Sequence, residues 1–161
     1  MEVKLKKAGP ADSEKIHAMQ VAAFHELLNI YQDYETNPAS ESIEFIEKKL
    51  NTENMDYYLI SVAETDIGAV RVVRHSKTEC RIAPVFILPE HQGYGYAKKV
   101  FGRLEQLYPQ MRLWKLDTIK QEQKLCYLYE SLGYRPTGRE ETIKPGMTLV
   151  YYEKVMESNG T

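Results

Sequence analysis

The sequence predicts an α/β (α+β) fold in which a mixed β-sheet carries helices on both faces. Apolar residues alternate with polar ones in several short segments, as in half-buried strands, and recur every three or four residues in others, as along one face of a helix. The segments follow one another in the order β-α-α-β-β-β-α-β-α-β-β, which favours a mixed sheet over a purely parallel one. The length of 161 residues fits one domain over 1–161.

Composition excludes several classes of protein. The net charge is −2 and the charged residues, 27% of the chain, are mixed in sign, so no basic field favours nucleic acid. The N-terminus lacks an apolar signal segment and no apolar run reaches about 18 residues, so we expect a cytoplasmic protein without membrane contact. Cys80 and Cys126 are too few and too far apart for a disulfide framework or a zinc site, and are expected to be reduced, buried thiols.

The first half of the chain begins with a strand at Val3 and Leu5, which ends at Gly9-Pro10. A helix capped by Asp12 or Ser13 follows, and residues 29–40 are expected to form a loop. A second helix, capped near Asn37 or Ser40, ends at residues 51–52. The predicted inner faces comprise Ile16, Met19, Ala23, Leu27 and Ile30 in the first helix, and Ile43, Ile46 and Leu50 in the second.

Three strands are predicted next. Residues 57–63 and 67–74 are rich in β-branched and aromatic side chains and are separated by residues 64–66, as in a hairpin with a three-residue connection. Residues 81–88 are nearly all apolar, which is typical of a strand covered on both faces near the centre of a sheet.

The second half continues with an amphipathic helix that ends at Pro109, a strand over residues 113–118 and a helix closed by Gly133. Strands over residues 134–138 and 147–155 complete the sheet, and the tail, residues 157–161, is expected to fray. The predicted inner faces comprise Ala97, Val100, Phe101, Leu104 and Leu107 in the first of these helices, and Leu125, Leu128, Tyr129 and Leu132 in the second.

Residues 85–101 combine an apolar strand stopped by Pro89, a turn containing Gly93 and Gly95, and the start of a helix. The glycines let the backbone approach a ligand closely, and the free N–H groups of the first helical turn attract anions. A Gly-x-Gly-x-x-Gly dinucleotide pattern and a Walker-type Gly-Lys-Ser/Thr are both missing from the sequence, which disfavours nucleotide hydrolysis. The stretch therefore predicts a phosphate or pyrophosphate site.

The order Ile87-x-Pro89-x-x-Gln92-x-x-Gly95-x-Ala97 resembles the Gln/Arg-x-x-Gly-x-Gly/Ala signature of the GCN5-related N-acetyltransferases (GNAT). The resemblance covers essentially the whole chain and implies a mostly antiparallel sheet of about seven strands, splayed at its centre. It also implies that backbone N–H groups from Gly93 to Lys98 hold the pyrophosphate of acetyl-CoA, and that the strand edge pairs with the pantetheine amides. The cofactor-binding residues expected from the resemblance are Val85, Phe86, Ile87, Gln92, Gly93, Tyr94, Gly95, Tyr96, Ala97 and Lys98. Lys98, Lys99 and Arg103 are candidates for the outer phosphates, and equally for a solvated helix face.

Tyr129 lies in a segment, residues 128–134, that looks like the final helix of the family, whose tyrosine points at the coenzyme sulfur. The resemblance implies that Tyr129 protonates the departing thiolate as a general acid, whereas its helical spacing alone predicts a core tyrosine. The family often has an asparagine seven residues earlier, where this chain has Glu122; Gln121 or Gln123 is the candidate replacement. A covalent route through Cys126 is disfavoured because a thiol on an apolar helix usually serves packing.

The base that deprotonates the acceptor is less well defined. The candidates are Glu26, Asp33, Glu35 and Glu79, all of them also ordinary surface acids, and the sequence does not choose among them. The first three lie in or near the loop that helps line the acceptor side in the family, and Asp33 is the one that we name as the catalytic residue. The acids near Tyr31 and Tyr34 suggest an acceptor with positive charge. His25 and His91 are more typical of surface or capping positions.

The sequence thus predicts an enzyme that transfers an acetyl group from acetyl-CoA, without a metal, to the primary amine of a small molecule or peptide by direct attack in a ternary complex. The alternatives are a non-catalytic acyl-CoA sensor with the same groove and a protein-interaction module that uses some of the 12 tyrosines. The last strands are candidates for homodimer formation.

Overall fold

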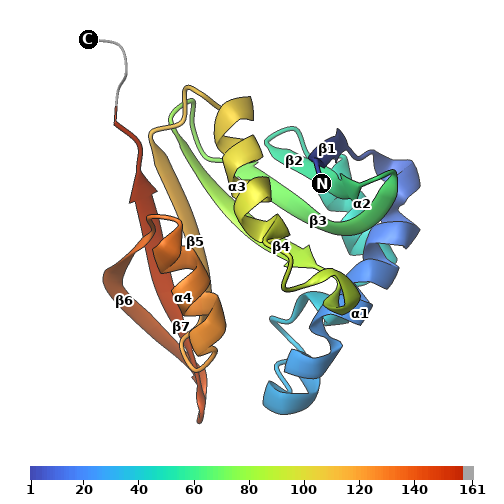
Figure 1. The fold of residues 1–161 in the computed structure, drawn as a ribbon. Helices are drawn as coiled ribbons and strands as arrows, with labels where there is room; N and C mark the ends of the chain where they lie inside the picture. Colours follow the sequence, from blue (N-terminus) through green and yellow to red (C-terminus); the bar gives the residue numbers. More distant parts are fainter. Residues whose placement is uncertain (158–161) are drawn as a thin grey trace.

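A seven-stranded mixed sheet in the order β1-β2-β3-β4-β5-β7-β6 forms the centre of the computed structural model, which describes residues 1–157 (Figure 1). Two helices, α1 and α2, cover one face, and α3 and α4 cover the other. The strands are β1 (Val3–Lys7), β2 (Met55–Val62), β3 (Thr65–Arg74), β4 (Glu79–Ile87), β5 (Leu113–Ile119), β6 (Arg135–Lys144) and β7 (Met147–Val155). The helices are α1 (Ser13–Tyr31), α2 (Ile43–Leu50), α3 (Tyr96–Leu107) and α4 (Gln123–Ser131). The predicted mixed sheet with helices on both faces is confirmed.

The sheet is splayed between its two central strands. Every neighbouring pair of strands is antiparallel except β4 and β5, which run parallel. Those two strands are in register only where Glu79, Cys80 and Arg81 face Leu113, Trp114 and Lys115. Beyond Arg81 the strands diverge, and Figure 1 shows the sheet opening in a V below this point. The fold therefore leaves a gap at the carboxyl ends of its central strands.

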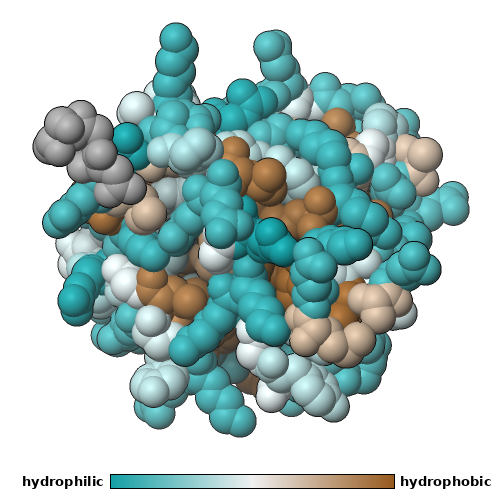
Figure 2. Space-filling view, turned by 45° about the horizontal axis from the view of Figure 1, so that its top comes forward, coloured by the Kyte–Doolittle hydropathy of each residue, from teal (hydrophilic) through white to brown (hydrophobic). Residues whose placement is uncertain are grey.

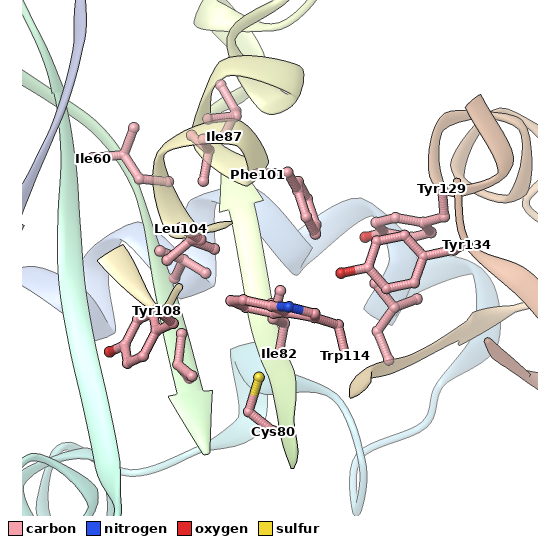
Figure 3. Packing of buried hydrophobic residues seen from close by; sticks show 14 of the residues in the cluster. Ile60, Cys80, Ile82, Ile87, Phe101, Leu104, Tyr108, Trp114, Tyr129 and Tyr134 are labelled. Atoms are coloured by element: carbon pink, nitrogen blue, oxygen red, sulfur yellow. The ribbon is translucent and has the colours of Figure 1, made fainter. Parts of the chain in front are cut away.

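Two hydrophobic clusters hold the layers together. The larger cluster lies between the sheet and the α3/α4 layer, where the ring of Phe101 meets those of Tyr129 and Tyr134 edge-on at 5.9 and 5.8 Å (Figure 3). The smaller cluster lies under α1 and α2 and includes Ile16 and Ile46, both fully buried. Burial of these apolar faces provides the main favourable free energy of such a fold, at roughly 25 cal/mol per Å².

Several helix details differ from the sequence prediction. Helix α1 continues to Tyr31, so the predicted loop begins later than residue 29, and Ile30, expected on the inner face, is 59% exposed. Leu107 is likewise exposed, because the chain turns at the end of α3 and buries Tyr108 instead. The Asp12 carboxylate accepts from the backbone N–H of Gly9 and not from the helix. Ile30 and Leu107 both lie in the last turn of their helix, where the side chain no longer packs against the sheet.

The cap of α2 and the hairpin also differ. Ser42 caps α2 by accepting from the N–H of Phe45, whereas Asn37 caps a short 3₁₀ turn, Pro38–Ser40. The β2–β3 hairpin has a two-residue connection, because Val62 already pairs with Thr65. Ala63 and Glu64 form the turn with φ of 48° and 66°, as a type I′ turn requires. This left-handed geometry usually takes glycine or asparagine, so the predicted three-residue connection was wrong.

Strand β4 is buried on alternate residues and not throughout, since Arg81, Ala83 and Val85 remain half-exposed. Of the two cysteines, both free, only Cys80 is fully buried, and burial raises the pKa of its thiol to about 12. Hydrophobic side chains show in the middle of the face in Figure 2, framed by hydrophilic ones. None of the helices in residues 1–157 is long and apolar enough to cross a bilayer. Apart from Glu157, the tail predicted to fray lies outside the described residues.

Candidate active site

A groove of about 850 Å³ lies where β4 and β5 diverge. Residues from β4, the turn after it, the first turn of α3, and α4 line one part of the groove. The second half of α1, the loop between α1 and α2, and the end of α2 line the rest, together with parts of β3, β5 and β7. A volume of this size is typical of sites for small molecules and cofactors.

The edge of β4 that faces the groove carries unpaired backbone groups. The N–H of Leu88 donates to the carbonyl of Ile67 at 2.7 Å, so Leu88 and Phe86 point their backbone groups toward β3. In an antiparallel pair successive residues alternate in this respect, and Val85 and Ile87 therefore point theirs toward the groove. The Ile87 carbonyl accepts from the side-chain amide of Gln92 at 2.8 Å. The N–H and carbonyl of Val85 and the N–H of Ile87 remain open to an extended ligand.

The turn after β4 forms an anion cradle at the start of α3. Gly93 and Gly95 adopt φ of 87° and 79°, a left-handed backbone that is costly for other residues. A Cβ added at either glycine would meet nothing within 4 Å, so the space in front of the backbone is open. Gly95 is the N-cap of α3 and has no side chain to bond the first-turn N–H groups. We call the groove-facing part of residues 85–98 the backbone wall.

Ten cofactor-binding residues are expected from the sequence, and the structure brings nine of them together along the groove. The exception is Tyr94, which is 67% exposed and stacks on Tyr96 at 5.7 Å between ring centroids. Phe86 contributes its side chain, edge-on to Phe24, and not its backbone. Lys98 lines the groove, whereas Lys99 bonds the carbonyl of Met1, and Arg103 pairs with Glu2.

Tyr129 lies on the opposite side of the groove, on α4. Its side chain is 7% exposed and packs between Phe101, Tyr134 and Tyr152. Figure 3 shows the hydroxyls of Tyr129 and Tyr134 directed toward Phe101 and the β4 side of the cluster. Burial, with a further contribution from Asp117, raises the pKa of the Tyr129 phenol well above its usual value. The phenol therefore keeps its proton at every physiological pH.

Of the four acids considered as bases, only Asp33 lines the groove. It is 8% exposed, and its carboxylate accepts from the side chains of Thr36 and Asn37, both at 3.3 Å. Glu26 and Glu35 are exposed, and Glu79 pairs with Lys115 at the closed end of the β4–β5 junction. Three of the four candidate acids are therefore outside the groove, although two of them lie in or near the loop that contains Asp33.

The candidate replacements near Glu122 are engaged elsewhere. The Glu122 carboxylate accepts from the Tyr31 hydroxyl at 2.5 Å, a contact that joins the end of α1 to the start of α4. Gln121 accepts from the N–H of Thr148, and neither Gln121 nor Gln123 is among the residues that line the groove. Cys126 also lies outside the lining. The two glutamines proposed as replacements thus lie outside the groove, whereas the neighbouring Lys124 lines it.

Sequence reasoning missed a group of charged residues on the α1/α2 side of the groove: Glu41, Lys49, Arg71, Arg81 and Asp117. We call this group the charged wall. Lys49 pairs with Glu41 at 2.9 Å, and Arg81 pairs with Asp117. The Arg71 Nε donates to the Ala83 carbonyl at 2.6 Å, and a second guanidinium nitrogen contacts the sulfur of Met55. The available signal was Arg71 itself, a cation in the middle of an apolar strand.

The metal-ligating residue types do not cluster. Among residues 1–157, no group of three or more His, Cys, Asp or Glu side chains is placed to hold a metal ion. The prediction that the reaction needs no metal is not tested by this arrangement and stays a prediction.

Comparison with known proteins connects this architecture to one family. Residues 25–156 match the family model described as the acetyltransferase (GNAT) domain. No curated protein sequence gives a significant match. The chain is similar in structure to an acetyltransferase from Thermus thermophilus, with 14% identity, a TM-score of 0.75 and coverage of 97% of this chain and 98% of that one.

Two further solved structures carry ligands. The spermidine N-acetyltransferase of Vibrio cholerae in complex with CoA and spermine has 18% identity, a TM-score of 0.76 and coverage of 96% of this chain and 95% of that one. The PaiA N-acetyltransferase of Thermoplasma acidophilum in complex with coenzyme A has 14% identity, a TM-score of 0.77 and coverage of 97% and 100%. At such low identity, these likenesses show the fold.

Proposed function

The chain belongs to the GNAT family of acetyltransferases, and from this premise we propose that it transfers the acetyl group of acetyl-CoA to a primary amine in a ternary complex. The observation that carries the proposal is the groove at the β4–β5 splay, with an unpaired strand edge on one side and the Tyr129 phenol on the other. Similar folds crystallised with coenzyme A support it. We propose that residues 1–161 act as one catalytic domain.

The backbone wall fits an extended thioester with a pyrophosphate at one end. The open backbone groups of Val85 and Ile87 would bond the pantetheine amides as an added strand does. The N–H groups between Gly93 and Lys98 would hold the pyrophosphate, because the glycine backbone is open there and the helix start is positively polarised. Lys98 would add one cation to this end.

Two side chains would then move protons. The acceptor amine attacks the thioester carbonyl, the carbon–sulfur bond breaks, and Tyr129 gives its proton to the departing thiolate. The attacking nitrogen must lose a proton, and Asp33 would accept it, because the other two groove-lining carboxylates, Glu41 and Asp117, are held in ion pairs. Since the phenol is a weaker acid than the thiol it serves, the transfer depends on position more than on acidity. Backbone N–H groups of β4 would also polarise the thioester carbonyl.

Binding and turnover together test the proposal. Acetyl-CoA at about 100 times its dissociation constant should raise the melting temperature by roughly 5–10 °C. Thiol release, followed with a panel of amines, then distinguishes an enzyme from an acyl-CoA sensor, which would bind without turnover. A protein-interaction module would show neither response.

A conservative variant tests the role of Tyr129. Tyr129→Phe should lower kcat by at least about 10²-fold and leave the acetyl-CoA-induced shift in place, because only the proton donor is lost. Unchanged turnover in Tyr129→Phe removes the phenol from the mechanism. Cys126→Ala, on the same helix but outside the groove lining, is the matched control and should retain activity. The cytoplasmic location and the homodimer stay predictions from the sequence.

A further inference from the structure

We propose that the acceptor of this chain carries a carboxylate close to its amine, as in an amino acid, and that Arg71 binds that carboxylate. The inference rests on the proposed acetyl transfer and names the class of acceptor. It differs from the positively charged acceptor that the acids around Asp33 suggested from the sequence.

The first support is the position of Arg71. Arg71 is only 8% exposed and yet lines the groove, so its guanidinium is held inside the protein and still reaches the ligand space. The bond from Nε to the Ala83 carbonyl fixes the group beside β4, two residues before Val85, where the backbone wall begins. An acceptor held by Arg71 would therefore lie next to the strand edge that receives the thioester.

The second support is that Arg71 has unused donor capacity. A guanidinium has five N–H groups in a planar fork that matches a carboxylate, and here its partners are a carbonyl and a thioether, both neutral. Within residues 1–157, no carboxylate forms an ion pair with Arg71. A buried arginine without an anionic partner is costly, and a carboxylate from outside the chain would satisfy it.

The third support is the balance of charge around Arg71. The charged wall contains three cations and two carboxylates, and each carboxylate already has a cation of its own: Glu41 pairs with Lys49, and Asp117 with Arg81. Glu41 also accepts from the side-chain amide of Gln20. The surplus charge is therefore positive, so this wall would attract an anionic group and repel a second ammonium group.

The polyamine alternative makes the opposite demand. Spermine, present in the Vibrio cholerae relative, offers only cationic and methylene groups. In this chain two acids of the segment between α1 and α2 line the groove, Asp33 and Glu41. Glu41 is paired with Lys49, whereas the Asp33 carboxylate bonds Asn37 and lies outside the ion pairs of the charged wall. One groove-lining acid without a cation partner fits one amine, and the surplus cation of the charged wall fits a carboxylate on the same acceptor.

The experiment compares each amino acid with the amine that lacks its carboxylate, for example lysine with cadaverine and phenylalanine with phenethylamine, with spermine as a further probe. Thiol release gives kcat/KM, and the thermal shift of the CoA-loaded protein gives binding independently of turnover. We expect the carboxylate member of the best pair to have at least about 10-fold higher kcat/KM, the size of one charge-assisted hydrogen bond. The preference should reside mainly in KM.

Arg71→Gln should erase that preference by raising KM for the amino acid about 10- to 100-fold, with little effect on its decarboxylated partner. Arg71→Lys, which keeps the charge without the planar fork, should retain part of it. The acetyl-CoA-induced thermal shift reports that both variants are folded. Arg135→Gln, exposed on β6 and outside the groove lining, is the matched control.

Each alternative outcome has a separate meaning. If spermine or the decarboxylated amines react or bind as well as the amino acids, the inference is overturned and the proposed acetyl transfer stands. The same holds if Arg71→Gln weakens both members of a pair equally. If acetyl-CoA itself does not bind, the proposed function fails and the inference fails with it.

Discussion

The backbone wall and the charged wall face the same groove but are built in different ways. The backbone wall presents N–H and carbonyl groups, positioned by an unpaired strand edge and by two left-handed glycines. The charged wall presents side chains from β3, β4, β5 and α2 and that of Glu41, which precedes α2; they are held by ion pairs and by one bond to a β4 carbonyl. A wall of backbone groups suits a ligand part that stays constant, whereas a wall of side chains is free to vary with the acceptor.

The largest effect is expected behind the backbone wall, where β3 packs closely against β4. In Gly68→Ala the new Cβ would lie 2.0 Å from the Phe86 carbonyl oxygen, so β3 and β4 would have to separate. We expect a loss of about 3 kcal/mol in the free energy of unfolding and a fall of roughly 6–12 °C in melting temperature. Urea unfolding measures it. Gly9→Ala, where a Cβ meets nothing within 4 Å, is the control and should change little.

A smaller loss is expected in the charged wall. Glu41→Gln leaves Lys49 buried beside Arg71 without its carboxylate partner, which should cost about 2 kcal/mol of unfolding free energy, less than for a fully buried pair because Glu41 is partly exposed. Adding Lys49→Met should recover part of this loss, since the double variant no longer buries an unpaired cation. A double-mutant cycle in urea measures the coupling; additive losses would show that the pair is energetically independent.

How far the two walls could be predicted from sequence follows from the same difference. The backbone wall could be predicted because its residues are contiguous in the sequence. An apolar strand, a proline and two spaced glycines there indicate a strand–turn–helix, whatever lies elsewhere in the chain. Nine of the ten residues expected there line the groove, and the mixed sheet and its two pairs of helices were also predictable from periodicity. Tyr94 was predicted to bind the cofactor but lies outside the groove, because its side chain, between the two left-handed glycines of the turn, points to solvent.

The charged wall could not be predicted in this way. Lys49, Arg71 and Arg81 lie on three different elements and meet only after the sheet has formed, so no short motif contains them. Their charges also look ordinary in the sequence, where lysine and arginine are common. The other wrong predictions each have a cause close by in the chain. The hairpin connection is shorter than predicted because Ala63 and Glu64 adopt a left-handed turn without glycine. Ile30 and Leu107 were predicted to be buried because they continue the apolar spacing of their helices, but both are exposed.

The smallest effect concerns the contact that joins α1 to α4. Partial burial, followed by the hydrogen bond to Glu122, raises the pKa of Tyr31 to about 12, whereas an unfolded tyrosine has a pKa near 10. Because the folded pKa is the higher one, the contact stabilises fully below pH 10 and loses this contribution as the pH rises from 10 to 12.

The hydrogen bond between Tyr31 and Glu122 should contribute less than about 1 kcal/mol to the free energy of unfolding, as for other exposed polar contacts. Melting temperatures of the wild-type protein and Tyr31→Phe at pH 8, 10 and 11 measure it. The difference between the two proteins should shrink as the pH rises, and a constant difference would mean that the Tyr31 proton plays no part in the stability of the contact.

The short junction between β4 and β5 has a consequence for cooperativity. The sheet is two continuous hydrogen-bonded ladders, β1 to β4 and β5 to β6, joined in register at only three residue pairs. Each ladder can behave as its own unit in native-state hydrogen exchange, with the amides of Val85 and Ile87 exposed at the seam. A bound pantetheine would accept hydrogen bonds from these amides. Occupancy of the groove would then slow their hydrogen exchange and make the two ladders open together as one cooperative unit.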